Sequence, residues 1–361
     1  MKKGTLIQML VGFALGIAGG IALIKVLDAH SLIKALYAML WLFILFLPSI
    51  IIHEGGHYVM GRLTGYKFVS FRIGSNTWVK QDGKLVRRKF KLAGTGGQCL
   101  LMPPESDTPE NVPFFWYNFG GGFFNLLTAL ICIPIGLLIN NFWVSAPFLM
   151  FGIMGIMFGI MNLVPLSTTV SNDGMNILRM MRDKSLRTAF YNSMAVNGMQ
   201  SEGAMLSDIS ERYFVLPEDA SKDAVDMNML LNAQRLEERF QFREADEMLS
   251  RFINDGSKVQ LYISEAKCER MFCRMAHGAD KSEIESLYDK EVKDYVKLTE
   301  KFFVTRRKLL YLYDLLYKED RDAAEKEYQK AVDMKGSYPN IGEYKTEMLI
   351  LEHIRNEHGM K

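Results

Sequence analysis

The stretch His53-Glu54-Gly55-Gly56-His57 has the residue types and the spacing of a hydrolytic metal site. Two histidines four positions apart on a helix project from one face, so both imidazoles can reach the same ion. Glu54 is offset around the helix, where its carboxylate can take a proton from a water molecule. Zinc lowers the pKa of a bound water to about 7. The pattern therefore indicates zinc-dependent hydrolysis.

The surroundings of this stretch are unusual for a hydrolytic site. It follows an uncharged run, residues 35–52, that is apolar enough to enter a lipid bilayer. Two unrelated histidines near a membrane boundary are the simpler alternative. However, the whole chain has only 6 histidines, and ionisable residues beside a membrane span are costly unless they serve a function. The metal-site interpretation is favoured.

A catalytic zinc needs a third protein ligand and one open position for water. Asp173 is a candidate, because it follows a polar loop and precedes a helical run that begins near Gly174. The membrane topology predicted below returns Asp173 to the same side of the bilayer as His57. Asp173 could equally serve only as the N-terminal cap of that helix, and spacing alone leaves the two interpretations even.

Four segments are long and apolar enough to cross a bilayer: residues 5–24, 35–56, 119–140 and 144–163. The first could also be a signal peptide, because Lys2 and Lys3 precede it. It is longer than a typical signal core, and no convincing cleavage site follows it. We therefore expect a retained membrane helix and a multi-pass integral membrane protein.

The distribution of basic residues predicts the orientation in the bilayer. Lysine and arginine are frequent between the second and third apolar segments, whereas residues 140–147 contain none. Basic residues also precede the first segment and follow the fourth. The positive-inside rule then places both termini, the basic loop and the opening of the metal site on the cytoplasmic side.

The basic loop, residues 66–102, has the alternation of β-strands. Residues 67–73 alternate apolar and polar side chains, and residues 78–86 contain the turn signal Asp82-Gly83. We expect a small cytoplasmic β hairpin here.

The second half of the chain is charged and helical. Residues 230–249 and 309–334 each indicate a pair of antiparallel helices with a short break between them. These pairs resemble tetratricopeptide repeats, although an irregular helical bundle fits equally well. Such a domain can bind a cytoplasmic protein partner.

Composition excludes several other functions. A formal net charge of +2 is too close to neutral to indicate a nucleic-acid partner. The 4 cysteines are too few and too scattered for a disulfide framework, and Cys268 and Cys273 lack the spacing of a metal or redox pair. They indicate buried thiols in a reducing compartment.

Three further motifs follow the His53–His57 stretch along the chain and, together with it, indicate a known protein family. Residues 94–102 contain glycines before an apolar strand, residues 120–125 combine three glycines with Asn125, and Asn162-Leu-Val-Pro165 is followed by Asp173-Gly174. With His53 to His57, the sequence resembles the site-2 protease family of intramembrane zinc metalloproteases over about residues 45–182. The interval of residues 166–172 is longer than the family usually has.

The resemblance implies a role for each matching residue. His53, His57 and Asp173 would bind Zn²⁺, and Glu54 would be the general base. Asn125 and Asn162 would be polar supports near the substrate backbone or the developing oxyanion. The substrate would be a membrane-anchored protein or peptide cut in or near its transmembrane segment, as in regulated intramembrane proteolysis or the processing of signal and pheromone peptides.

The expected fold is mainly α: a membrane helix bundle with a small cytoplasmic β hairpin and a C-terminal soluble helical domain. The expected parts are an N-terminal membrane helix and connection (1–34), a protease core (35–182), a linker (183–214) and a cytoplasmic helical domain (215–361). Two other functions stay open: a membrane scaffold that retains zinc and binds a partner through its helical domain, and a zinc hydrolase for small molecules. Glu54 favours the protease, since binding alone does not need it.

Overall fold

The computed structural model describes residues 31–81, 83–90, 96–166, 171–255 and 260–360. The chain divides into two compact units. The membrane unit comprises residues 1–68, 96–104 and 113–182, and the helical unit comprises residues 69–95, 105–112 and 183–361. The apolar segment predicted at residues 5–24 lies outside the described residues. The predicted domain limits stay a prediction.

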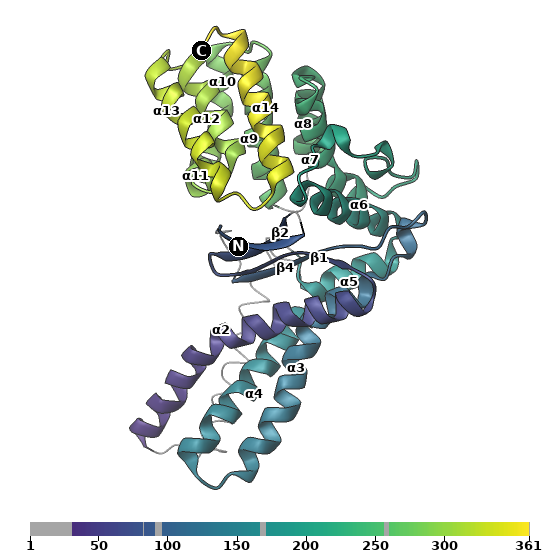
Figure 1. The fold of residues 1–361 in the computed structure, drawn as a ribbon, viewed down its shortest axis with the longest axis vertical. Helices are drawn as coiled ribbons and strands as arrows, with labels where there is room; N and C mark the ends of the chain where they lie inside the picture. The colour runs from purple at the N-terminus through teal and green to yellow at the C-terminus, as the bar shows by residue number, and fades with distance from the viewer. Residues whose placement is uncertain (1–30, 82, 91–95, 167–170, 256–259, 361) are drawn as a thin grey trace. The chain divides into compact units, whose positions relative to one another are not determined.

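Three helices of the membrane unit, among the residues that the structure describes, are long and apolar enough to cross a bilayer. They are α2 (Leu32–Leu63), α3 (Phe114–Leu138) and α4 (Phe142–Leu163), which pack against one another (Figure 1). Large apolar side chains lie on their outer surfaces, and Phe43 and Leu138 are each 82% exposed. Such surfaces suit lipid, so the helices indicate an integral membrane protein. The helical structure expected of three of the predicted spans is confirmed.

Glycines allow the three membrane helices to approach closely. A Cβ atom on Gly56 of α2 would lie 2.3 Å from the carbonyl oxygen of Gly120 on α3. A Cβ on Gly155 of α4 would lie 2.4 Å from the carbonyl oxygen of Asn125. Small residues at such crossings let helix backbones pack in a membrane, where lipid supplies no hydrophobic drive for association. The helix that carries His53 is thereby held against its neighbour.

Four strands form one sheet in the order β3-β2-β1-β4. The strands are β1 (Lys67–Ile73), β2 (Asn76–Gln81), β3 (Lys84–Lys89) and β4 (Gly97–Met102). β1 pairs antiparallel with β2, and β2 with β3, where Gln81 faces Lys84 across the predicted turn. Gly83 has a φ of 75°, which a turn of this length requires and glycine tolerates. The hairpin is confirmed, within a larger sheet than expected.

The rest of the chain is helical. The helices are α5 (Asp173–Arg182), α6 (Lys184–Ser201), α7 (Lys222–Glu238), α8 (Phe242–Asp255), α9 (Gln260–Ala276), α10 (Lys281–Leu287), α11 (Lys290–Thr299), α12 (Val304–Leu316), α13 (Arg321–Asp333) and α14 (Ile341–Glu357). The short 3-10 turn η1 (Pro109–Asn111) precedes α3, and the turns η2 (Leu206–Asp208), η3 (Glu211–Tyr213) and η4 (Met334–Gly336) lie between later helices. α6 lies within the segment predicted to be a linker. The helix pairs predicted at 230–249 and 309–334 are confirmed, whereas their likeness to tetratricopeptide repeats stays a prediction.

Candidate metal centre

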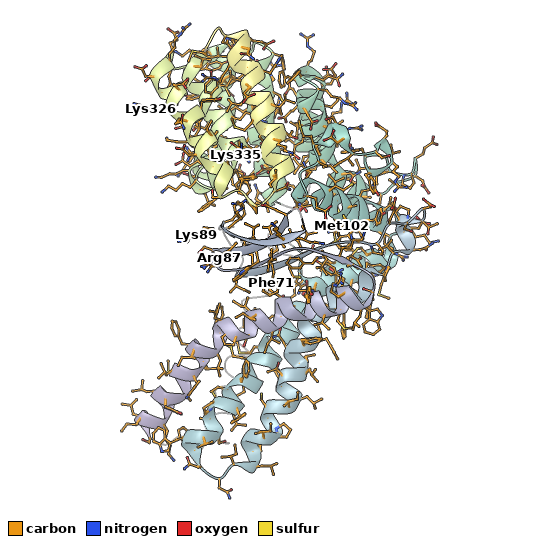
Figure 2. The ribbon with its side chains drawn as sticks, viewed as in Figure 1. Phe71, Arg87, Lys89, Met102, Lys326 and Lys335 are labelled. Carbon is orange, nitrogen blue, oxygen red and sulfur yellow. The ribbon has the colours of Figure 1, made fainter. Side chains whose placement is uncertain are left out.

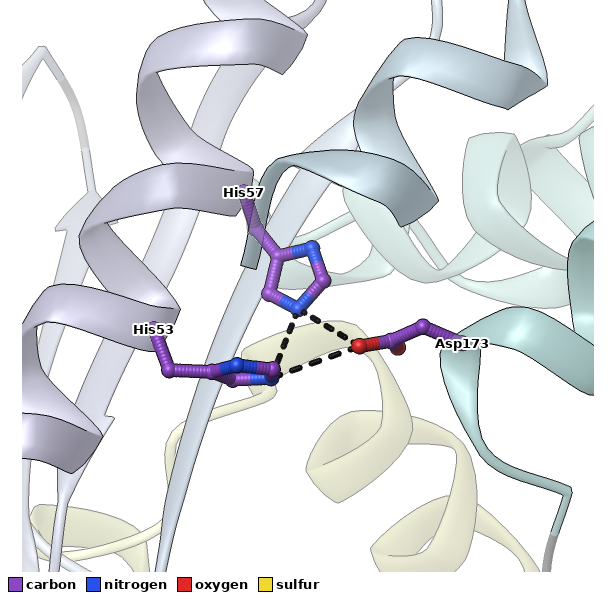
Figure 3. A group of neighbouring side chains, drawn as sticks. All are labelled: His53, His57 and Asp173. Carbon is purple, nitrogen blue, oxygen red and sulfur yellow. Dashed lines mark hydrogen bonds and ion pairs between the residues drawn. The ribbon is translucent and has the colours of Figure 1, made fainter. Parts of the chain in front are cut away.

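The helix α2 holds three of the predicted site residues. His53 and His57 lie one turn apart, and their Nε2 atoms are 3.1 Å from each other (Figure 3). Both side chains are buried, as is Glu54. A hydrogen bond between two Nε2 atoms would need one of them to carry the proton. The hydrogen bonds that orient the two rings are instead made by their Nδ1 atoms.

The Nδ1 atoms face hydrogen-bond acceptors. His53 Nδ1 lies 2.9 Å from Asn125 Oδ1, and His57 Nδ1 lies 2.7 Å from the Tyr117 carbonyl oxygen. Asn125 donates its Nδ2 to the Ser49 carbonyl at 3.0 Å, so its Oδ1 is the atom that accepts from His53. Both neutral imidazoles therefore carry their proton on Nδ1, which leaves the two Nε2 lone pairs directed at one point.

Asp173, on another helix, directs its carboxylate at the same point as the two Nε2 atoms. It is the first residue of α5, and its Oδ2 lies 3.3 Å from His53 Nε2 and 3.4 Å from His57 Nε2. The three ligand atoms lie within 4.8 Å of one another. Asp173 Oδ2 is buried and accepts no hydrogen bond from the residues that the structure describes. Two nitrogen lone pairs and an ionised oxygen facing each other repel unless a cation lies among them, so these residues fit a metal ion.

Asn172 provides the N-terminal cap of α5, so Asp173 is not needed for that task. Asn172 Oδ1 accepts from the backbone nitrogen of Met175 at 3.0 Å. Its Nδ2 donates to the carbonyl oxygens of Met161 and Val164, each at 2.7 Å. Asn172 therefore ties the end of α4 to the start of α5 and positions Asp173. Asn172 was not among the predicted site residues, although an asparagine before Asp-Gly at a predicted helix start is a recognisable cap signal.

Two glycines keep space around the centre. A Cβ on Gly121 of α3 would lie 2.5 Å from His57 Nε2 and 2.8 Å from His53 Nε2, within the volume that an ion needs. A Cβ on Gly174 would lie 2.1 Å from the Leu163 carbonyl oxygen, so only glycine lets α5 begin so close to α4. These contacts give a physical reason for a glycine after Asp173.

Glu54 and the two predicted asparagines occupy different places. Glu54 lies beside β4, where a Cβ on Gly97 would be 2.7 Å from Glu54 Oε1. Asn125 contacts His53, as described above. Asn162 donates to the Phe158 carbonyl at 2.9 Å and lines an apolar groove of about 780 Å³ between α2 and α4. The structure thus brings Asn125, but not Asn162, into hydrogen-bond contact with the histidines.

The charge state of Asp173 suits a ligand. Burial acts to raise the pKa of this carboxyl group, but the positive charge of a protonated His57 or His53, together with their hydrogen bonds, outweighs burial and holds the pKa below its ordinary value. A metal cation in place of that proton acts in the same direction. The carboxylate is therefore ionised at neutral pH, as metal binding requires.

Comparison with known proteins agrees with this geometry. Residues 41–142 match Peptidase family M50. No curated protein and no solved structure matches the chain. The matched range contains His53, Glu54, His57 and Asn125 but ends before Asp173. Asp173 is assigned to the centre by its distances to His53 and His57.

Proposed function

Residues 41–142 belong to peptidase family M50, a family of metalloproteases of the site-2 protease type, and from this premise we propose that the chain is an intramembrane zinc endopeptidase. Its substrates would be membrane-anchored proteins or peptides, cut in or near their transmembrane segments. The observation that carries the proposal is the meeting of His53, His57 and Asp173 within a unit built of three membrane-length helices.

The donor set suits zinc. Two neutral imidazoles from α2 and one carboxylate from α5 would hold the ion, in the three-ligand arrangement of catalytic zinc sites. When bound, zinc supplies a Lewis acid and lowers the pKa of a bound water to about 7. Asn125 and the Tyr117 carbonyl keep the two rings in the required tautomer.

Glu54 is suited to move protons. In this proposal its carboxylate accepts a proton from the water that attacks the scissile carbonyl carbon. It then gives that proton to the departing amine nitrogen as the C–N bond breaks. Its burial beside β4 excludes bulk water from this exchange.

β4 offers a way to present an extended substrate to Glu54. The strand lies at one end of the sheet, next to β1. It runs along α2, since Gly97 lies against Glu54 and a Cβ on Gly61 would meet Leu101 Cδ1 at 2.2 Å. A substrate segment paired with β4 would have its backbone unwound and would pass the general base. Unwinding matters because a helical peptide bond is shielded by its own hydrogen bonds.

We further propose that both termini and the opening of the site are cytoplasmic. The basic loop between α2 and α3 and the absence of basic residues in 140–147 support this orientation. Water would then reach the metal from the cytoplasmic side.

The test is cleavage by the wild type and by Glu54→Gln. Each would be co-expressed with candidate single-span proteins, and the products would be identified by mass spectrometry. Glu54→Gln keeps the size and hydrogen-bonding capacity of the side chain, so it should retain zinc while cleavage falls about 10²–10⁴-fold. Identical fragments from both proteins would refute the peptidase and favour the zinc-binding scaffold.

A further inference from the structure

The helical unit contains a pocket that the proposed peptidase chemistry does not use. It has a volume of about 540 Å³ and lies between the end of β3, the turn η4 and the helix α14. Arg88 connects these elements, because its Nη1 donates to the Gly336 carbonyl oxygen at 2.6 Å. The ring of Phe90, just after β3, lies 6.0 Å from that of Tyr338. We call this site the β3–α14 pocket.

The floor of the β3–α14 pocket is apolar. Tyr338, Tyr344 and Met348 line it and are largely buried, whereas Leu349 is 39% exposed. Methionine and tyrosine adapt to ligands of different shape, since methionine is flexible and tyrosine has an apolar ring with a polar end. The floor is therefore suited to one apolar side chain.

Cations surround this floor. Arg88, Lys335 and Lys345 line the pocket, against a single carboxylate from Glu352. Arg88 and Lys345 donate to neutral oxygens, those of Gln81 and Gly203 among them. Within the described ranges none of the three cations has an ion pair, and Arg88 Nε is buried without a hydrogen bond. The excess of positive charge favours an anionic ligand.

The neighbouring strand indicates that this ligand is a peptide. β3 lies at the end of the sheet order and pairs only with β2 among the strands described. Its six residues include Lys84, Arg87, Arg88 and Lys89 and no acidic residue; Figure 2 labels Arg87, Lys89 and Lys335. Basic residues on an edge strand can serve merely to prevent aggregation. Prevention of aggregation does not explain the apolar pocket beside the strand, whereas peptide binding explains both features.

We propose that the β3–α14 pocket binds an extended acidic peptide segment of a partner protein. The segment pairs with the edge of β3 that no other described strand covers, where its carboxylates oppose the lysines and arginines of that strand. One apolar side chain of the segment enters the pocket over Tyr338 and Met348. This interaction goes beyond the proposed peptidase activity, since none of its residues is needed for hydrolysis.

Binding can be measured on the full-length Glu54→Gln protein in detergent, which removes cleavage from the readout. The probe is a fluorescent peptide of alternating glutamate and threonine around a central leucine, followed by anisotropy. Matched peptides carry glutamine in place of glutamate, or alanine in place of leucine. We expect each change to weaken binding about tenfold or more, and added salt to weaken the acidic peptide selectively. Equal affinity for the glutamate and glutamine peptides would overturn the proposal.

Charge reversal locates the site. Lys335→Glu combined with Lys345→Glu should weaken the acidic peptide at least tenfold and should favour a peptide with lysine in place of glutamate. Both side chains are exposed, so folding should survive, and circular dichroism would verify it. Lys326→Glu, on the exposed surface of α13 and outside the pocket, is the matched control and should change affinity little. An equal loss in the control would mean that only bulk charge matters and would overturn the assigned site.

Discussion

The membrane unit and the helical unit both bury ionisable side chains, but they compensate the charges differently. In the helical unit, Lys308 is fully buried and lies 2.6 Å from Glu237, 2.8 Å from Glu347 and 3.3 Å from Glu269. Arg306 adds a second buried cation 2.8 Å from Glu269. The carboxylates there face cations that the protein itself supplies.

The metal centre has no such internal partner. Two imidazole lone pairs and Asp173 Oδ2 converge, and among the described residues no lysine or arginine pairs with that carboxylate. A buried charged cluster that contains its own counter-ions is typical of a structural network. A cluster whose lone pairs meet without a cation is typical of a ligand site. Both clusters are buried, so burial does not distinguish them. They differ in the source of the compensating charge, which is the protein itself in the structural cluster and a bound ion in the ligand site.

Removing Asp173 should have the largest effect. Asp173→Ala deletes one of three ligands, and we expect loss of most of the zinc and of all measurable cleavage. Elemental analysis of the detergent-purified protein gives the metal content. Asp183→Ala, at the start of α6, is a control because that carboxylate caps a helix by accepting from Leu186. Full zinc retention in Asp173→Ala would mean that another residue is the third ligand.

Removing the buried cation of the helical unit should lower the stability of that unit without changing the zinc content of the protein. Lys308→Met leaves buried carboxylates without their cation, so the helical unit should lose about 3–5 kcal/mol of stability. Hydrogen exchange of backbone amides in α12, followed by mass spectrometry, measures that loss locally. Zinc content should stay at the wild-type level. Unchanged exchange would show that Lys308 does not compensate the cluster.

Removing the orienting amide should have a smaller effect on the metal centre. Asn125→Ala deletes the acceptor at His53 Nδ1, and such partners typically contribute about 10–100-fold to metal affinity. Competition with a chromogenic chelator gives the affinity. Asn118→Ala is the matched control, because Asn118 is buried on the same helix but, among the residues that the structure describes, bonds only to the Phe114 carbonyl. Equal losses in both variants would indicate a general packing defect.

The smallest expected effect is a pH dependence in the helical unit. Burial, opposed by Lys308, raises the pKa of Glu237 to about 8 from its ordinary 4.5. Below pH 4.5 the folded and unfolded states are both protonated, so this stabilisation is complete there. It is lost progressively as pH rises from 4.5 through 8. Amide exchange of α12, measured across this pH range, gives the stability. In Glu237→Gln the stability should depend less on pH than in the wild type, whereas the same pH dependence in both proteins would contradict the raised pKa of Glu237.

Local patterns in the sequence predicted the elements better than the contacts between them. The spacing of His53 and His57 indicated a shared helix face, residues 67–73 form β1 as expected, and Gly83 lies in the turn between β2 and β3. These signals depend on side-chain periodicity and backbone conformation within a few residues. The order of the four strands depends on pairing between distant segments, which no local pattern contains.

Asp173 and Lys308 show where sequence reasoning stops. The sequence allows Asp173 to be either the cap of α5 or a metal ligand. In the structure Asn172 provides the cap, because its Oδ1 accepts from the backbone nitrogen of Met175. Lys308 lies in a charged segment typical of a solvent-exposed helix surface, yet it is buried against Glu237. That contact spans 71 positions in the chain. Compensation of charge is a property of the packed structure, so it could not be predicted from the residues near each group.

X-ray absorption at the zinc edge of the purified Glu54→Gln protein would identify the metal ligands. We expect one zinc per chain with two imidazole nitrogens and a carboxylate oxygen at about 2.0–2.2 Å, and no sulfur ligand. Asp173→Asn should shift the spectrum or lose the metal, whereas Lys308→Met should leave the spectrum unchanged. A zinc-free protein after purification with added zinc, or a spectrum with sulfur or with a single imidazole, would exclude a zinc site formed by His53, His57 and Asp173.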